Sequence, residues 1–147
     1  MSLTQGATNT FKTGLANGSF SFSNPSDTSY RIALYTGSAN LGPDTTAYTS
    51  SGEATGGSYV AGGATLTITQ VPTQGNQTGS TAATYWSFAN VTWTGGITAR
   101  GALIYKYNGT TNPTVCVLDF GSDKTSANTF VVQFPTSSSS TAILRIA

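Results

Sequence analysis

Short segments in which apolar side chains fall on every second position recur along this chain, separated by residues that favour turns. In residues 30–36, Tyr30, Ile32 and Leu34 lie on one face of such a segment. A chain with many short strands and polar turns buries its apolar faces between two sheets. We therefore predict an all-β, single-domain antiparallel β-sandwich or flattened barrel of about seven or eight strands. The expected strands cover residues 30–36, 64–71, 84–88, 91–94, 97–107, 114–121, 130–134 and 142–146.

Some turns and strand ends can be placed within this series. Gly95 and Gly96 form a hairpin dipeptide before the strand at 97–107, whose partner is expected at 114–121. The segment 114–121 is apolar on both faces, which is typical of a central strand covered on both sides. Asp119 then lies at its semi-buried end, and the residues directly after this strand are expected to form a turn.

One segment near the amino terminus is compatible with a short helix. Residues 10–16 place apolar side chains among small and polar ones, and Asn17 with Gly18 provides a stop signal. We divide the chain into an N-terminal arm with this helix at 1–22 and a β-sandwich at 23–147. The two parts are expected to form one structural domain.

The chain carries few charged side chains, at 7% of its residues, whereas a soluble domain usually carries about 25%. Hydroxyl and amide side chains take the place of charges, and these residue types disfavour helix interiors. The net charge of +1 creates no long-range field that would attract nucleic acid or an anionic membrane. No apolar stretch approaches the length of a membrane span. We therefore expect neither nucleic acid nor a membrane as a partner.

Residues that catalysis usually needs are scarce. The chain has no histidine, so it lacks the commonest general base and every Ser-His-Asp or Cys-His arrangement. No pair of its five acidic residues is flanked by the polar and aromatic cluster that a glycosidase cleft requires. The single cysteine, Cys116, lies mid-strand among apolar neighbours, which indicates inert packing. We therefore expect no enzymatic activity and no cofactor.

Two acidic residues leave one alternative for a metal site. Asp119 and Asp123, together with backbone carbonyl groups, could bind a hard cation such as calcium, which needs six to eight oxygen ligands. The simpler interpretation is a turn at residues 121–124 in which Asp123 bonds to the nearby backbone. We favour the turn and expect no metal.

Two long segments lack a strand pattern. Residues 72–83 form a polar linker, and residues 37–63 contain few aliphatic side chains but hold Tyr48, Glu53 and Tyr59. A loop as long as the second segment is either functional or packed by its own side chains. The tyrosines therefore either form a contact surface for carbohydrate or protein, or fold back over the sandwich. The sequence leaves both interpretations open.

Four segments are more distinctive than the composition. They read ALYT at residues 33–36, AYTSSGE at 47–53, SYVAGG at 58–63 and WTGGITARGALIY at 93–105. With these segments the chain resembles a family of small virion structural proteins of tailed bacteriophages, and the resemblance covers nearly the whole chain. It implies a capsid decoration (cement) or tail-associated protein, assembled on the virion in the host cytoplasm. It transfers no functional residue.

Two functions therefore stand side by side. The first is a capsid decoration protein that binds and stabilises the major capsid shell. Its expected partners are the major capsid protein and further copies of itself, in a homo-oligomer for which a trimer is one candidate. The N-terminal arm and the loop 37–63 are expected to make the contacts. The candidate contact residues are Phe11, Lys12, Leu15, Tyr48, Glu53 and Tyr59.

The alternative function is a tail- or fibre-associated module that binds the host through carbohydrate. In this hypothesis Tyr35, Tyr48, Tyr59 and nearby amides contact the sugar, because a tyrosine ring offers a rigid amphipathic face. Neither function needs a catalytic residue, a metal or a cofactor.

Overall fold

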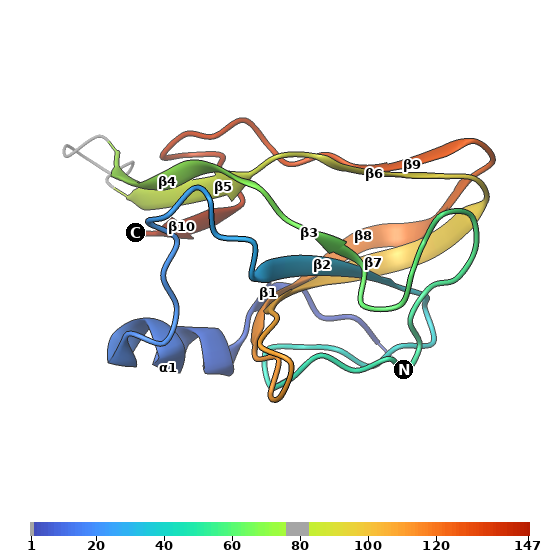
Figure 1. The fold of residues 1–147 in the computed structure, drawn as a ribbon, viewed down its shortest axis with the longest axis horizontal. Coiled ribbons are helices and arrows are strands. Elements are labelled where there is room, and N and C mark those ends of the chain that lie inside the picture. Colours follow the sequence, from blue (N-terminus) through green and yellow to red (C-terminus); the bar gives the residue numbers. More distant parts are fainter. Residues whose placement is uncertain (1, 76–82) are drawn as a thin grey trace.

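The computed structural model describes residues 2–75 and 83–147, which form two layers of antiparallel strands with one short helix beside them (Figure 1). One layer is a five-stranded sheet in the order β1-β8-β7-β2-β3. The other contains a three-stranded sheet, β10-β5-β4, and a two-stranded sheet, β6-β9. The prediction of an all-β sandwich with a short N-terminal helix is confirmed. The elements are β1 (Gly6–Ala7), α1 (Asn9–Asn17), β2 (Tyr30–Tyr35), β3 (Ala64–Thr65), β4 (Ile68–Gln74), β5 (Thr84–Phe88), β6 (Val91–Thr94), β7 (Ile97–Lys106), β8 (Thr114–Ser126), β9 (Thr129–Val132) and β10 (Leu144–Ile146).

The centre of the five-stranded sheet is buried on both faces, and β2 shows how. Tyr30, Ile32 and Leu34 belong to the core between the two layers. Ala33 and Tyr35 belong to a separate apolar cluster on the opposite face. All five residues are fully buried. The alternation in this strand therefore separates two apolar environments, not a core from water.

Aromatic side chains fill the space between the layers. The ring of Phe22 stacks on Tyr30 with centroids 4.3 Å apart and lies 5.2 Å from the ring of Trp86 on β5. Phe88 follows on the same strand, 6.1 Å from Phe22. Trp93 on β6 is also buried. Aromatic groups at these separations bury large apolar areas and add favourable ring contacts, so this core holds the two layers together.

Helix α1 begins and ends with specific caps. The side chain of Thr8 accepts a hydrogen bond from the backbone nitrogen of Phe11 (3.1 Å), and Gly18 adopts the left-handed conformation after the last turn. The Phe11 ring is buried 6.2 Å from that of Trp86, which fixes the helix to the sandwich. The helix is one residue longer at each end than the sequence predicted. No helix among the described residues is long and apolar enough to cross a membrane.

The strand expected at 64–71 is divided between the two layers. Its first part, β3, pairs with β2, whereas β4 pairs with β5. Leu66 lies at the crossing, fully buried, and its backbone nitrogen donates to β2. The strand β4 then continues past Pro72 with an irregular register, so the predicted linker 72–83 begins as strand. Residues 76–82 of that linker lie outside the described residues.

Two predictions about turns are wrong. Strands β7 and β8 do pair, as expected, but Gly95 and Gly96 close no hairpin because β6 pairs with β9. The two glycines instead carry the chain from one layer to the other. The turn predicted at 121–124 is part of β8, which runs on to Ser126, and Asp119 therefore lies within the strand. Period-two patterns identify strands but do not identify their partners.

Candidate functional site

The first part of the loop 37–63 covers the outer face of the five-stranded sheet, and its second part reaches the core between the layers through Ala54 and Tyr59. Its side chains Ala39 and Leu41 are buried, and the ring of Tyr48 stacks on that of Tyr105 with centroids 4.8 Å apart. Leu3 of the N-terminal arm packs against the same cluster. The sheet contributes Ala33, Tyr35, Leu103, Tyr105 and Val117. The loop and the arm thus share a second apolar core with the sheet.

The carboxylate of Glu53 is the polar centre of this loop. Its Oε2 accepts a hydrogen bond from the Tyr48 hydroxyl (2.6 Å), and its Oε1 accepts one from the Tyr59 hydroxyl (2.5 Å). The backbone nitrogen of Gly62 also donates to Oε1 (2.7 Å). The Tyr59 hydroxyl in turn accepts a hydrogen bond from the backbone nitrogen of Leu34 (2.9 Å). Three of these bonds converge on Glu53 within the loop, and the fourth joins the loop to strand β2 through Tyr59.

Two further tyrosines extend this network from the sheet. The Tyr35 hydroxyl donates to the carbonyl oxygen of Thr49 (2.6 Å), and the Tyr105 hydroxyl donates to that of Gly62 (2.7 Å). Glu53 itself forms an antiparallel bridge with Tyr35 along the edge of β2. We call Tyr35, Tyr48, Glu53, Tyr59 and Tyr105 the tyrosine–glutamate network. The tyrosines fold back onto the sandwich, which is one of the two interpretations that the sequence left open.

Burial and the Glu53 charge raise the pKa values of these tyrosines. For Tyr59 and Tyr48, burial is the largest cause and the hydrogen bond to Glu53 is the next. For Tyr35, burial raises the pKa most, followed by the negative charge of Glu53. An unperturbed tyrosine has a pKa of about 10. The hydroxyl groups therefore stay protonated and act as donors at neutral pH.

The N-terminal arm lies beside the loop, although more than thirty residues separate them in the sequence. The backbone nitrogen of Thr4 donates to the carbonyl oxygen of Leu41 (2.8 Å), and the nitrogen of Leu41 donates to the carbonyl oxygen of Ser2 (3.0 Å). We call the surface formed by residues 2–5 and 37–52 the arm–loop face. Its exposed side chains include Ser2, Thr4, Gln5, Ser38, Asn40, Asp44, Thr46, Ser50 and Ser51. This surface is rich in hydroxyl and amide groups and poor in charge.

The structure separates the six candidate contact residues into two groups. Phe11 is buried and Leu15 is half-buried in contact with the core between the layers, while Lys12 is exposed. Tyr48, Glu53 and Tyr59 come together in the tyrosine–glutamate network and are half-buried. Of the six residues, only Lys12 has an exposed side chain. The other five pack against the sandwich and position the residues that are exposed around them.

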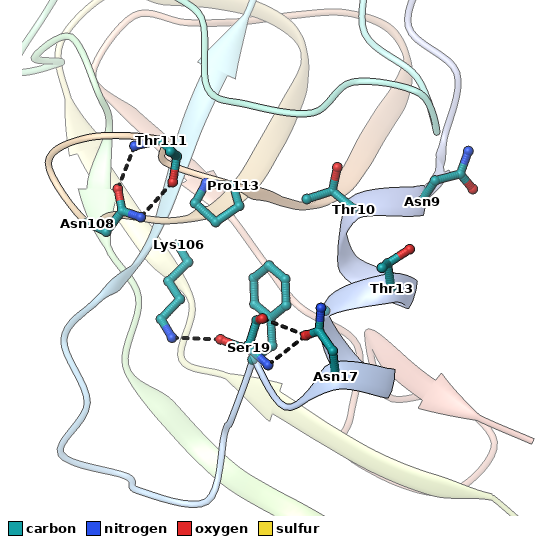
Figure 2. A pocket seen from close by; sticks show the side chains of 11 residues that line it. Asn9, Thr10, Thr13, Asn17, Ser19, Lys106, Asn108, Thr111 and Pro113 are labelled. Atoms are coloured by element: carbon teal, nitrogen blue, oxygen red, sulfur yellow. Dashed lines mark hydrogen bonds between the residues drawn. The ribbon is translucent and has the colours of Figure 1, made fainter.

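A second feature is a groove between α1 and the turn that joins β7 to β8 (Figure 2). It has a volume of about 700 Å³, within the range of small-molecule sites. The helix contributes Asn9, Thr10, Thr13 and Asn17, and the opposite wall contributes Asn108, Thr111 and Pro113. Lys106 and Ser19 face each other across one end, where the Lys106 ammonium group donates to the Ser19 carbonyl oxygen (3.0 Å).

The sequence analysis missed this groove because its two walls are about a hundred residues apart in the chain. One signal was available on the helix. Asn9, Thr10, Thr13 and Asn17 are polar and recur at the helical period, which places them on one face. No pattern indicated that the turn after β7 would stand opposite that face.

The remaining candidates for chemistry are engaged in structural contacts. Asp119 accepts hydrogen bonds from the backbone nitrogen of Gly121 (2.9 Å) and from Nε of Arg100 (3.1 Å), and these bonds lower its pKa. Burial raises the pKa of the Cys116 thiol to about 12, which agrees with an inert packing role. Within residues 2–75 and 83–147, no group of three or more Cys, Asp or Glu side chains is placed to hold a metal ion.

Comparison with protein-family models, with curated proteins and with solved structures gave no match for this chain.

Proposed function

We propose that this chain is a virion structural protein of a tailed bacteriophage that binds the outside of the capsid shell and stabilises it. The proposal starts from the resemblance carried by residues 33–36, 47–53, 58–63 and 93–105. The observation that carries it further is the position of the arm and the loop. These are the two segments expected to make contacts, and they lie together in the arm–loop face.

The physical character of this face suits a broad interface. Hydroxyl and amide groups form direct and water-mediated hydrogen bonds without the desolvation cost of charges. A standard interface buries about 800 Å² per partner, roughly a tenth of the 7268 Å² accessible surface of the described chain. A single face of this molecule is therefore large enough to bind a capsid subunit, and other surfaces remain for contacts between copies in a homo-oligomer.

The network behind the face supports the same function. Glu53 and the tyrosines hold the loop in one conformation, so little conformational entropy is lost when the loop meets a partner. A decoration protein gains its affinity from many weak contacts, and a preformed surface makes each of them more favourable. The network thus acts as a support for binding and takes no direct part in it.

Host binding through the tyrosines has less support. Tyr35 is fully buried, and the hydroxyl groups of Tyr48 and Tyr59 are bonded to Glu53. A sugar could reach neither the ring of Tyr35 nor these hydroxyl groups without opening the loop. We therefore prefer the capsid function to the tyrosine-based host-binding function.

The test is reassembly on particles. Purified protein is mixed with virions stripped of it, the added density is located by cryo-electron microscopy, and the temperature of DNA release is recorded. The proposal expects density on the shell and a raised release temperature. Density confined to the tail, or no density, would overturn it.

A pair of matched variants identifies the surface. Thr4→Glu with Thr46→Glu places two carboxylates on the arm–loop face, whereas Thr92→Glu with Thr129→Glu places two on exposed positions of β6 and β9. Charges left unpaired in an interface cost about 2–5 kcal/mol. We expect the first pair to abolish particle binding and the second to leave it intact. The reverse result would assign the contact to the other layer.

A further inference from the structure

The groove beside α1 presents polar side chains that have no partner in the described part of the chain. The side chains of Asn9, Thr10 and Thr13 make no hydrogen bond within residues 2–75 and 83–147. In Asn17 the carbonyl oxygen accepts from Ser19, which leaves the amide nitrogen free to donate. Hydroxyl and amide groups each offer donors and acceptors. One face of the helix, whose side chains are drawn in Figure 2, therefore offers several groups of both kinds to a ligand.

The opposite wall of the groove is fixed by its own hydrogen bonds. Oδ1 of Asn108 accepts from the backbone nitrogens of Thr110, Thr111 and Asn112, each at 2.9 Å. The Asn108 amide nitrogen donates to the Thr111 hydroxyl (2.8 Å). The helix on the other side is capped at both ends. Because both walls are already ordered, the groove loses little conformational entropy when a ligand binds.

Apolar groups line the groove between these polar walls. Pro113 is half-buried, whereas Phe20 is buried, with 6% of its surface exposed, and forms part of the floor of the groove. The Phe20 ring lies so close to the helix backbone at Gly14 that a Cβ atom there would collide with it. The Phe20 ring therefore occupies the space that a side chain at position 14 would need. An apolar surface flanked by hydroxyl and amide groups matches the C–H face and the hydroxyl rim of a pyranose ring.

The charge of the groove indicates which sugars fit it. Lys106 is the only charged side chain among its lining residues, and no carboxylate accompanies it there. Its Nζ donates to the Ser19 carbonyl oxygen (3.0 Å) and lies 5.9 Å from the centre of the Phe20 ring. An ammonium group has three donors, so Lys106 can bond to a ligand while it keeps the bond to Ser19.

We propose that this groove binds an acidic oligosaccharide. A pyranose ring packs against Pro113 above the floor formed by the buried Phe20, its hydroxyl groups bond to the Asn and Thr side chains of the helix, and a sugar carboxylate meets Lys106. The proposal does not depend on the capsid function, because it uses neither the tyrosine–glutamate network nor the exposed side chains of the arm–loop face.

The test is an NMR titration of the full-length ¹⁵N-labelled protein at physiological salt. The probes are trigalacturonate, the neutral trisaccharide maltotriose, and acetate at the same carboxylate concentration. We expect trigalacturonate to shift the signals of Thr10, Thr13 and Asn108, maltotriose to bind more weakly, and acetate to have no effect. The absence of shifts in the groove with trigalacturonate, or equal shifts with acetate, would overturn the proposal.

Matched lysine variants complete the test. Lys106→Met keeps the apolar stem but removes the charge, and Lys12→Met removes a charge from the exposed side of the same helix, outside the groove. We expect Lys106→Met to weaken trigalacturonate binding about tenfold, because a charge-assisted bond is lost, and Lys12→Met to leave it unchanged. Asn9→Ala, at an exposed position, is expected to weaken binding in a protein that keeps its fold. Equal effects of the two lysine variants would contradict the assignment.

Discussion

At its centre the five-stranded sheet is buried on both faces, but the two faces are covered in different ways. The inner face is covered by paired strands that bring in aromatic side chains such as Trp86 and Phe88. The outer face is covered by the arm and the loop 37–63, of which the loop contains no strand of its own. Strands satisfy their backbone groups by pairing, whereas a loop needs other partners. The tyrosine–glutamate network provides such partners for the loop, whereas on the inner side the Tyr30 hydroxyl is bonded to the backbone of Ser21 alone.

This difference implies that the inner face determines whether the chain folds and the outer face determines whether the loop is ordered. Replacing a core aromatic side chain should therefore unfold the whole molecule. Replacing a member of the network should loosen one region and leave the rest intact. The following experiments test that division, beginning with the largest expected effect.

Trp86→Ala should cause the largest loss of stability. The side chain lies on β5 and is buried against Phe11 and Phe22, and truncating such a residue costs about 3–5 kcal/mol. Urea unfolding followed by circular dichroism measures the loss. Trp86→Phe should cost less, because the ring contacts are partly kept. If the alanine variant lost only loop order and kept its unfolding midpoint, the comparison between the faces would be wrong.

Glu53→Gln should destabilise the outer face by about 2 kcal/mol, because hydrogen bonds to a charged acceptor are each worth about 1.5–3 kcal/mol and the amide replaces only part of them. Hydrogen exchange should accelerate at the backbone nitrogens of Gly62 and Leu34, which lie at the network. Exchange in β5 should not change. Asp44→Asn removes an exposed acid from the same loop and serves as the control, with no expected effect.

Alkaline pH should destabilise the fold, and Tyr59 should account for part of the loss. Burial and Glu53 raise the pKa of Tyr59 in the folded state above the unfolded value of about 10. A raised pKa contributes stability that is complete below pH 10 and is lost as the pH rises above it, at about 1.4 kcal/mol per pH unit for each such group. Unfolding midpoints measured between pH 9 and 11 should therefore fall, and the fall should be smaller in Tyr59→Phe. An identical pH profile for the variant would contradict the assignment to Tyr59.

Tyr48→Phe should have the smallest effect, about 1 kcal/mol, because it removes one donor and keeps the stacking on Tyr105. Tyr59→Phe should cost more, because the Tyr59 hydroxyl both donates to Glu53 and accepts from Leu34. Thermal unfolding of the two single variants and the double variant measures their coupling. Strictly additive losses would show that the two bonds to Glu53 are independent.

Much of the strand pattern was predictable from local sequence, but the partners of the strands were not. The alternation in residues 30–36 located β2, and the apolar segment at 114–121 located the centre of β8. The glycines at 95 and 96 suggested a hairpin, yet they connect two sheets. A dipeptide defines a local turn geometry, whereas pairing depends on which apolar faces meet after the whole chain has collapsed.

The candidate site was predictable only in part, for the same reason. Tyr48, Glu53 and Tyr59 lie within twelve residues of one another, so the sequence indicates that they belong to one loop. Their inward orientation depends on Tyr35 and Tyr105, which come from strands elsewhere in the chain. The groove joins Asn9 to Asn108, and the local pattern indicated only its polar helix face and not the opposite wall.

The amino-acid sequence by itself determined the class of fold, because alternation and turn residues act over a few neighbouring positions. It also determined the scarcity of charge and the lack of histidine, which restrict the chemistry open to the chain. Only the tertiary structure decided that the loop closes over the sheet through Glu53, and that α1 faces the turn after β7. Those arrangements depend on contacts between segments far apart in the chain, and such contacts form only when burial of the apolar faces brings the segments together.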